Sequence, residues 1–215
     1  MINAIIFDLD SCLCAANEVG DPLYAPVFEA IKNANHGNLE ADALQAAFSE
    51  CWRCAFDFVA QKYGFTPDMI TAGWDAFKKV AVTTPMRGYD DLPVLKELPV
   101  QLFLVTSGFR RLQESKIRAL GFAHWFAAIH IDAIDEPERK GKQRLFEEIL
   151  ATHGLRREEV LVVGDNPDSE IEAGNRLGIK TVQILRSGVP RCHNAAHYVN
   201  NLIELKELPT TLSPP

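Results

Sequence analysis

Two acidic residues, Asp8 and Asp10, follow the first apolar run of the chain, which reads AIIF from Ala4 to Phe7. The run is apolar at every position and partly β-branched, which is typical of a short strand buried on both faces. In open α/β sheets, ligands bind beyond the carboxyl ends of the strands, so carboxylates at this point lie where chemistry is expected. A strand followed by an aspartate-containing turn is the purely structural alternative.

Two later apolar runs also end in polar residues. QLFLVT ends in Thr106 and continues into Ser107, and VLVVGD ends in Asp165. Parallel strands bring such ends to one edge of a sheet, where carboxylates and hydroxyls near helix N-termini suit an anion together with a divalent metal. Lys140 and Lys142, in ERKGKQ just before a predicted helix, supply positive charge near that edge. Taken singly, such a hydroxyl often only caps a helix, and such a lysine is usually solvated.

The second half of the chain alternates between strand and helix patterns. The predicted strands are residues 101–106, 127–131, 160–165 and 180–185. The predicted helices are residues 110–121, 144–154 and 170–178, the first two closed by Gly121 and Gly154. Such alternation predicts right-handed βαβ crossovers and an α/β, Rossmann-like open parallel sheet in a three-layer αβα core, which the first strand joins.

The segment between the first strand and this alternating region shows no strand pattern. It predicts helices over residues 39–63 and 67–80 instead. One apolar face of the first is formed by residues at three- and four-residue spacing, namely Leu44, Phe48, Cys51, Ala55 and Val59. We therefore expect an α/β core of residues 1–14 and 84–215, with residues 15–83 as a helical insertion, and a frayed end over LPTTLSPP.

Composition narrows the function classes. The 215-residue chain carries a net charge of −7 without a long basic run, which argues against a nucleic-acid-binding surface. Its apolar runs are strand-sized, and its first run is too short for a secretory signal, so neither a membrane span nor export is expected. Five cysteines without a pairing pattern are typical of reduced thiols, so we expect a cytoplasmic monomer or homodimer.

Two groups of cysteine and histidine residues contain the residue types that bind metals, but each has too few ligands for a metal site. Cys51 and Cys54 have a CxxC spacing with no second pair, and on a helix they would simply share a face. Cys192, His193 and His197 are also too few, and we interpret them as a surface loop.

Together these motifs resemble the haloacid dehalogenase superfamily, most of whose members are magnesium-dependent phosphatases. FDLDSCL resembles its first motif, FLVTSG its second, the lysine before RLFEEIL its third, and VVGDNPDSEIEAG its fourth. The resemblance runs from Ile5 to about Arg186 and omits the helical insertion, which in this superfamily is a cap over the active site. Cys12 stands where threonine or valine is frequent, and we interpret it as a packing residue.

The resemblance implies a role for each motif residue. Asp8 would attack phosphorus to form an aspartyl-phosphate, and Asp10 would protonate the leaving group and then activate water. Thr106 would bind a phosphoryl oxygen, assisted by the backbone N–H groups of Ser107 and Gly108.

A magnesium site is implied by the same resemblance. Its ligands would be Asp8, the backbone carbonyl of Asp10, Asp165 and, through water, Glu170, with Asp168 as a nearer alternative to Glu170. Hard carboxylate oxygens and retained waters are what Mg²⁺ prefers. The third-motif lysine would neutralise Asp8 and the phosphate. Spacing to the following apolar residues slightly favours Lys142 over Lys140.

A cap implies a small phosphorylated metabolite as the substrate, because a closed cap excludes water and contacts the leaving group. Tyr24, Trp52 and Arg53 are candidates for facing that cleft, although residues of these types on helices more often pack or lie on the surface. Three alternatives stay open: a sugar-phosphate mutase, a metal-independent dehalogenase of the same superfamily, and a catalytically idle binding or regulatory domain. Asp10 disfavours the dehalogenase, whose chemistry has no alcohol leaving group to protonate.

Overall fold

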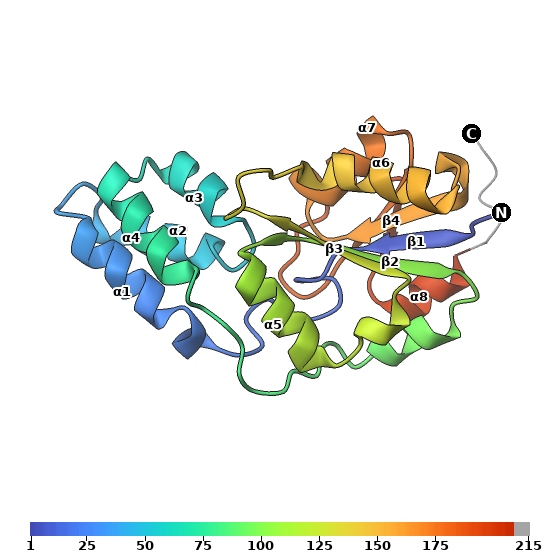
Figure 1. Ribbon diagram of the computed structural model, residues 1–215, viewed down its shortest axis with the longest axis horizontal. Coiled ribbons are helices and arrows are strands. Elements are labelled where there is room, and N and C mark those ends of the chain that lie inside the picture. Colours follow the sequence, from blue (N-terminus) through green and yellow to red (C-terminus); the bar gives the residue numbers. More distant parts are fainter. Residues whose placement is uncertain (209–215) are drawn as a thin grey trace.

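The computed structural model describes residues 1–208 and builds its core on a six-stranded, wholly parallel sheet (Figure 1). The strand order is β3-β2-β1-β4-β5-β6. The strands are β1 (Ala4–Phe7), β2 (Gln101–Gly108), β3 (Ala128–Ala133), β4 (Val160–Gly164), β5 (Lys180–Ile184) and β6 (His197–Val199). This architecture confirms the predicted Rossmann-like α/β fold, with the first strand of the chain at the centre of the sheet.

The register of β1 places the acidic residues of two strands side by side. Phe7 lies opposite Leu104 of β2 and Val163 of β4, and the backbone N–H of Asp8 donates to the Val163 carbonyl at 2.9 Å. All four residues of β1 are buried, as its continuous apolar run predicts. Asp8 and Asp165 therefore leave the sheet at the same edge, from neighbouring strands.

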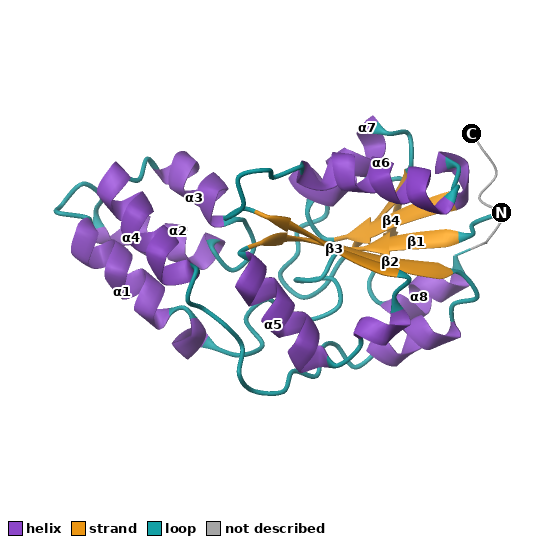
Figure 2. Cartoon of the chain, in the orientation of Figure 1, coloured by secondary structure: helices purple, strands orange, loops and turns teal. Residues whose placement is uncertain are grey.

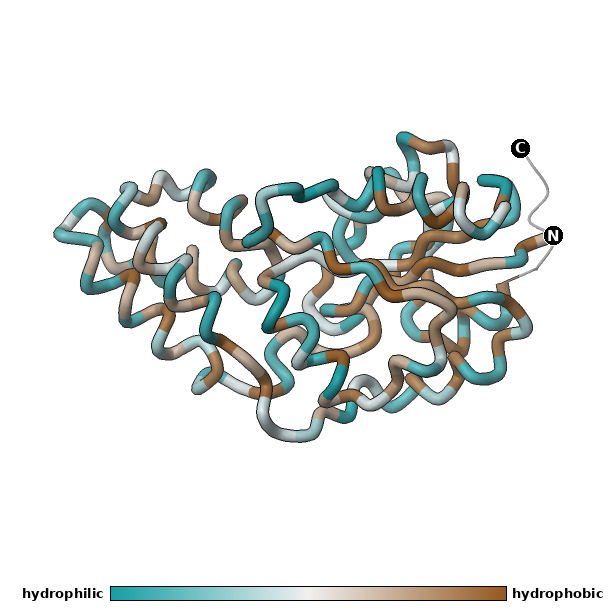
Figure 3. Tube along the Cα trace, viewed as in Figure 1, coloured by the Kyte–Doolittle hydropathy of each residue, from teal (hydrophilic) through white to brown (hydrophobic). Residues whose placement is uncertain are grey.

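Helices cover both faces of the sheet (Figure 2). They are α5 (Arg110–Leu120), α6 (Gly141–His153), α7 (Glu172–Arg176) and α8 (Leu202–Glu207). Ile6 packs in the cluster that contains Phe146 of α6, whereas Ile5 and Phe7 belong to the cluster that contains Leu112 of α5. Successive strand residues thus bury opposite faces, which gives the three-layer αβα arrangement. Figure 3 shows the consequence as hydrophobic strands between helices of mixed polarity.

The predicted ends of two helices are confirmed. Gly121 closes α5 and Gly154 closes α6, both in the left-handed region with φ of +69° and +63°. Glycine adopts this conformation without a Cβ penalty, so the helix stop can be read from the sequence. The helix predicted over residues 170–178 instead begins with a π-helical turn, Pro167–Ile171, ahead of α7.

The insertion is helical and lies beyond the carboxyl ends of the strands, at the end of the molecule opposite the N-terminus (Figure 1). Its helices are α1 (Ala25–Ala34), α2 (Ala41–Glu50), α3 (Phe56–Tyr63) and α4 (Pro67–Phe77). The prediction of one helix over residues 39–63 is wrong, because the chain turns over residues 51–55, where Ala55 is extended. Packing across the insertion accompanies this break: the ring centroids of Trp52 and Tyr24 lie 4.0 Å apart in a stacked arrangement, and those of Phe56 and Phe77 lie 5.1 Å apart.

The two connections between the insertion and the sheet are joined to each other. The Glu18 carboxylate accepts hydrogen bonds from the backbone N–H groups of Arg87 and Gly88, and the Leu13 carbonyl accepts one from Tyr89 at 3.0 Å. The predicted domain boundaries, at residues 14/15 and 83/84, fall close to this crossing. The division into two domains stays a prediction.

The C-terminal part of the sheet departs from the sequence interpretation in one place. His197 is not in a loop: it begins β6, which pairs with β5 through Val182. Cys192 and His193 do lie in the preceding loop. A strand of three residues is too short to show a hydrophobic periodicity in the sequence. β6 forms because these residues pair with β5. Of the expected frayed tail, residues 209–215 lie outside the described residues. Within residues 1–208, no helix has the length and apolarity needed to cross a bilayer.

A buried ion pair ties the first-motif loop to the C-terminal region. The Arg186 guanidinium donates to both oxygens of Asp91 at 2.7 and 2.9 Å, and to the Cys12 carbonyl at 2.9 Å. It also lies 4.0 Å from the ring centroid of Tyr89, and the backbone N–H of Leu202 donates to Asp91. One side chain therefore links three segments that are distant in sequence.

Arg186→Met is expected to lower the free energy of unfolding by about 3–5 kcal/mol, because it leaves the buried Asp91 carboxylate without its counter-charge. Urea titration followed by circular dichroism measures the loss. Asp91→Leu combined with Arg186→Met should recover part of it, because no unpaired charge then remains. A loss of less than about 1 kcal/mol for the single variant would contradict the assigned role.

Candidate active site

The two acids of the first motif point into one cavity from the end of β1. Asp8 is buried, and the side chain of Asp10 is 22% exposed. Leu9 between them is fully buried, whereas Asp8 and Asp10 both line the same cavity. After Asp10 the chain turns sharply at Ser11, whose φ of +56° lies in the left-handed region. Both carboxylates therefore face the same space.

Lys142 is the lysine that the structure brings to Asp8. Its ammonium donates to Asp8 Oδ1 at 2.8 Å and to Glu170 Oε2 at 2.7 Å. Lys140 is instead paired with the Glu148 carboxylate at 2.9 Å on the exposed side of α6. Lys142 lies on the face of α6 that packs against the sheet, whereas Lys140 precedes the helix. Both lysines were candidates from the sequence. Only Lys142 lies on the buried face of α6 and reaches Asp8, whereas Lys140 at the start of the helix stays exposed.

Three buried acids gather beside this lysine. One oxygen from each of Asp8, Asp165 and Glu170 lies within 4.8 Å of the other two. A Cβ on Gly164 would come within 2.2 Å of Glu170 Oε1, so only glycine lets Glu170 lie over the end of β4. The backbone N–H of Asn166 donates to the same oxygen at 2.6 Å. Asp168, the alternative to Glu170, is exposed and outside the cluster.

The charges of this cluster do not balance. Burial raises the pKa of Asp8 to about 7, against the opposing charge of Lys142, and Glu170 adds to the rise. Burial likewise raises the pKa of Asp165 to about 8. For Lys142, burial would lower the pKa, but Asp8 and Glu170 outweigh it and raise the pKa above its ordinary range. Three carboxylates around one ammonium are short of positive charge, and their hard oxygen donors fit a Mg²⁺ ion.

The second-motif residues have different surroundings. Thr106 is buried, and its hydroxyl accepts a hydrogen bond from Gln113 Nε2 at 2.9 Å. The Ser107 hydroxyl donates to Asp132 Oδ2 at 3.0 Å, which engages it with β3. Gly108, with a φ of +149°, makes room for the Gln113 side chain, because a Cβ there would lie 3.1 Å from Nε2. Of the three, Thr106 is the one whose side chain shares a hydrogen-bond donor, Gln113, with Asp10.

Two residues that sequence reasoning missed contact Asp10 from α5. Lys116 donates to Asp10 Oδ1 at 2.7 Å, and Gln113 Nε2 donates to Asp10 Oδ2 at 3.0 Å. Both donors are 2% exposed. Burial would lower the pKa of Lys116, but Asp10 outweighs it and raises the pKa above its ordinary range. The sequence did contain a signal for them. Gln113 and Lys116 are polar residues three positions apart that adjoin the apolar Leu112 and Ile117, so they fall on the buried face of the predicted helix.

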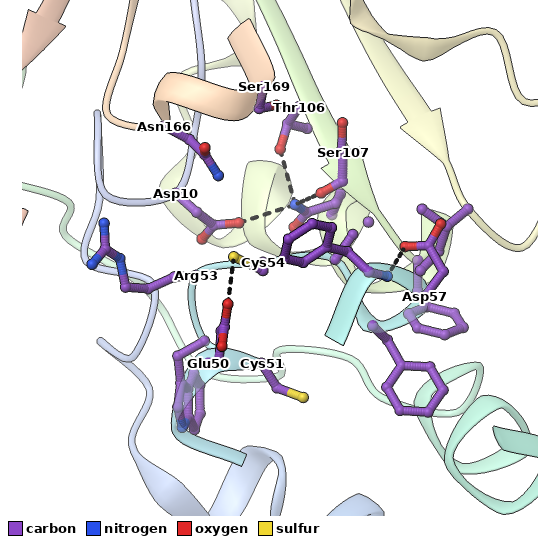
Figure 4. A pocket seen from close by; sticks show the side chains of 18 of the residues that line it. Asp10, Glu50, Cys51, Arg53, Cys54, Asp57, Thr106, Ser107, Asn166 and Ser169 are labelled. Carbon is purple, nitrogen blue, oxygen red and sulfur yellow. Dashed lines mark hydrogen bonds between the residues drawn. The ribbon is translucent and has the colours of Figure 1, made fainter. Parts of the chain in front are cut away.

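A cavity of about 490 Å³ separates these groups from the insertion (Figure 4). Tyr24, Trp52 and Arg53, the three candidates for facing the cleft, all line it. Trp52 and Tyr24 are occupied with each other, whereas the Arg53 guanidinium reaches toward the acids and lies 3.5 Å from Asp165 Oδ2. Cys54 also lines the cavity, in the turn between α2 and α3 rather than on a helix, with its thiol 3.8 Å from Glu50.

Comparison with known proteins identifies the family of the chain. The model of the haloacid dehalogenase-like hydrolases matches residues 2–178. The chain belongs to the haloacid dehalogenase-like hydrolase family. Among its relatives are glyceraldehyde 3-phosphate phosphatase of Methanocaldococcus jannaschii, 28% identical with 97% of each chain covered, and N-acylneuraminate-9-phosphatase of Mus musculus, 27% identical with 96% of this chain and 93% of that protein covered.

Solved structures of this hydrolase family share the fold. A HAD phosphatase from Thermococcus onnurineus superimposes with a TM-score of 0.62 at 19% identity, covering 96% of this chain and 97% of that one. L-2-haloacid dehalogenase from Xanthobacter autotrophicus gives a TM-score of 0.59 at 15% identity, covering 99% and 100%. The similarity covers sheet and insertion together, so the helical insertion is part of the shared architecture.

Without metal, this hydrolase is expected to lose thermal stability as the pH rises from about 4 to about 8. Folded Asp8 and Asp165 hold their protons up to about pH 7 and 8, whereas the unfolded chain releases them near the ordinary pKa of 3.8. The folded state therefore binds more protons within this window, and raising the pH favours unfolding. A Mg²⁺ ion held by these acids would favour their ionised forms, so added Mg²⁺ should raise the melting temperature more at about pH 8 than at about pH 5.

Differential scanning fluorimetry with and without Mg²⁺ measures both effects. Asp165→Asn is the control, because it removes one of the two titrating groups and should flatten the pH dependence. Equal stabilisation by Mg²⁺ at both pH values would contradict the raised pKa values of Asp8 and Asp165 on which this prediction rests.

Proposed function

We propose that this protein is a magnesium-dependent phosphohydrolase that acts on a small phosphorylated metabolite through an aspartyl-phosphate on Asp8. The observation that carries the proposal is the buried Asp8 carboxylate, which contacts Lys142 and lies beside Asp165 and Glu170 at the edge of the sheet. The phosphatase names of the relatives support the same reaction class.

In the first step, Asp8 attacks the phosphorus atom. Lys142 contacts Oδ1, which leaves Oδ2 as the oxygen that we assign to the attack. The new bond joins Asp8 to phosphorus, the bond between phosphorus and the leaving oxygen breaks, and Asp10 gives that oxygen a proton. In the second step, Asp10 takes a proton from water as the water attacks phosphorus, which releases inorganic phosphate and restores Asp8.

The phosphoryl group is held by the end of β2 in this mechanism. The Thr106 hydroxyl accepts from Gln113, so its own proton is available to a phosphoryl oxygen. The backbone N–H groups of Ser107 and Gly108 are assigned to the same anion. Positioning and charge stabilisation of this kind are most of what phosphoryl transfer requires.

Mg²⁺ is the cofactor that we propose. Asp8, Asp165 and the backbone carbonyl of Asp10 would hold it, with Glu170 supporting through water because its own oxygens already bind Lys142 and Asn166. When bound, the ion supplies neutralisation of the charge on the phosphoryl oxygens.

The helical insertion acts as the cap in this proposal. It closes a cavity of about 490 Å³, which is suited to a small metabolite rather than a folded protein substrate. The five cysteines, all free in the described chain, support a cytoplasmic location. A sugar-phosphate mutase would return the phosphoryl group to its product, and an assay for isomerised product tests that alternative.

Asp8→Asn is expected to lower Mg²⁺-dependent hydrolysis of p-nitrophenyl phosphate by about 10³-fold or more, because an amide cannot attack phosphorus. Lys142→Met should cost about 10²–10³-fold in kcat, since it removes the cation beside the developing charge. Lys140→Met is the matched control and should stay within about twofold of wild type. Activity that survives chelation of Mg²⁺, or equal losses for the two lysine variants, would contradict the proposal.

Arg53→Ala is expected to raise KM several-fold with a smaller effect on kcat, because the guanidinium reaches the cavity from the insertion without forming part of the acid cluster. Steady-state kinetics with Mg²⁺ measures both constants. Lys62→Ala is the control, because Lys62 lines the same cavity but is paired with Glu50 at 2.7 Å. Equal effects of the two substitutions would argue against contact between Arg53 and the substrate.

A further inference from the structure

We propose that Gln113 and Lys116 of α5 are positioning residues that aim the Asp10 carboxylate at the leaving group. This inference rests on the proposed acid–base role of Asp10. Gln113 and Lys116 lie outside the family motifs, on α5, which covers the face of the sheet opposite the α6 helix that carries Lys142.

The contacts hold Asp10 by both of its oxygens. Lys116 Nζ lies 2.7 Å from Oδ1, and Gln113 Nε2 lies 3.0 Å from Oδ2. Gln113 and Lys116 are three residues apart, so they extend from the same face of α5. A carboxylate held through one oxygen can still rotate about its χ2 bond, whereas two donors at fixed positions determine the plane of the group.

Gln113 also links Asp10 to the proposed phosphoryl site. Its amide nitrogen lies 2.9 Å from Thr106 Oγ1 and 2.9 Å from the Ser107 carbonyl, and in Figure 4 the dashed lines from Asp10, Thr106 and Ser107 meet at this nitrogen. One amide therefore sets the spacing between the group that transfers the proton and the hydroxyl that holds the phosphoryl group.

Packing alone does not account for these two residues. Gln113 Oε1 is buried without a hydrogen-bond partner among the described residues, which costs stability that an apolar side chain would not lose. Lys116 is 2% exposed, and its ammonium has Asp10 as its hydrogen-bonded counter-ion. A buried ion pair is weak evidence of stability, so a role at Asp10 is the better explanation.

The orientation of Asp10 is consequently set by the core and not by the insertion. Leu112 and Ile117 anchor α5 in the hydrophobic cluster below the sheet. Asp10 itself lies in the turn around Ser11, where it forms an isolated β-bridge with Cys14 and has the Cys14 thiol 4.0 Å from Oδ1. Aiming by α5 keeps Asp10 in place whatever position the insertion adopts.

The test uses the leaving group as the readout. General acid catalysis matters most when the leaving group is poor, so Gln113→Leu and Lys116→Met should lose more kcat on phenyl phosphate than on p-nitrophenyl phosphate. We expect a loss of about 10²-fold on phenyl phosphate and a loss at least tenfold smaller on p-nitrophenyl phosphate, with KM nearly unchanged for Lys116→Met. Lys116→Arg, which keeps the charge, should recover part of the loss. Glu114→Gln, on the exposed side of the same helix, is the control.

A double substitution separates positioning from a general structural effect. In the Asp10→Asn background, Lys116→Met should cause no further loss on phenyl phosphate, because the group that Lys116 positions is already disabled. Inhibition by inorganic phosphate should be unchanged in Lys116→Met, because the hydrogen bond of Lys116 goes to Asp10 and not to the phosphoryl site, and this shows that the site is still folded.

Two outcomes would overturn the inference. Equal losses on both substrates, or a further loss in the double variant, would make Gln113 and Lys116 structural residues while leaving the phosphatase function intact. If the wild type hydrolyses neither substrate with Mg²⁺, the proposed function itself fails and the positioning role falls with it.

Discussion

The structure depends on one electrostatic constraint, which is the gathering of three buried carboxylates around a single buried ammonium. Asp8, Asp165 and Glu170 come from β1, the end of β4 and the π-helical turn after it, and Lys142 from the first turn of α6. Like charges at this distance are unfavourable unless cations compensate them. The parallel register, the missing side chain at Gly164 and the phase of α6 all serve to bring these four groups together.

The two carboxylates of the first motif are controlled by opposite layers of the fold. Asp8 is bound by Lys142 of α6 on one face of the sheet, and Asp10 by Lys116 of α5 on the other (Figure 1). Two acids only two residues apart thereby receive different environments. Different environments for neighbouring carboxylates are how proteins separate a nucleophile from an acid–base group.

The insertion and the core meet through aromatic and polar contacts, among them Phe77 stacked on Phe109 with 5.0 Å between ring centroids. Glu18 joins the two connections, and Arg53 extends from the insertion to Asp165. The buried pair of Arg186 and Asp91 fixes the first-motif loop from the side of α8. One side of the cavity is therefore the edge of the sheet, which the Arg186–Asp91 pair anchors. The other side is the helical insertion, which is joined to the core by two adjacent connecting segments.

The sequence by itself determined the elements and motifs whose signals are local. The run AIIF, the glycines that close α5 and α6, and the acids and hydroxyls at strand ends depend on neighbouring residues alone, and their positions in the structure agree with them. The strand–helix alternation was likewise sufficient for the parallel sheet.

Only the tertiary structure decided the features that depend on contacts between distant segments. The phase of α6 against the sheet selected Lys142 over Lys140, and packing of Trp52 on Tyr24 accompanied the break that divides residues 39–63. Gln113 and Lys116 look like ordinary residues of an amphipathic helix, because their partner Asp10 is about a hundred residues away in sequence. Burial and ion pairing across such separations leave no periodic signal, so they appear only when the chain is folded.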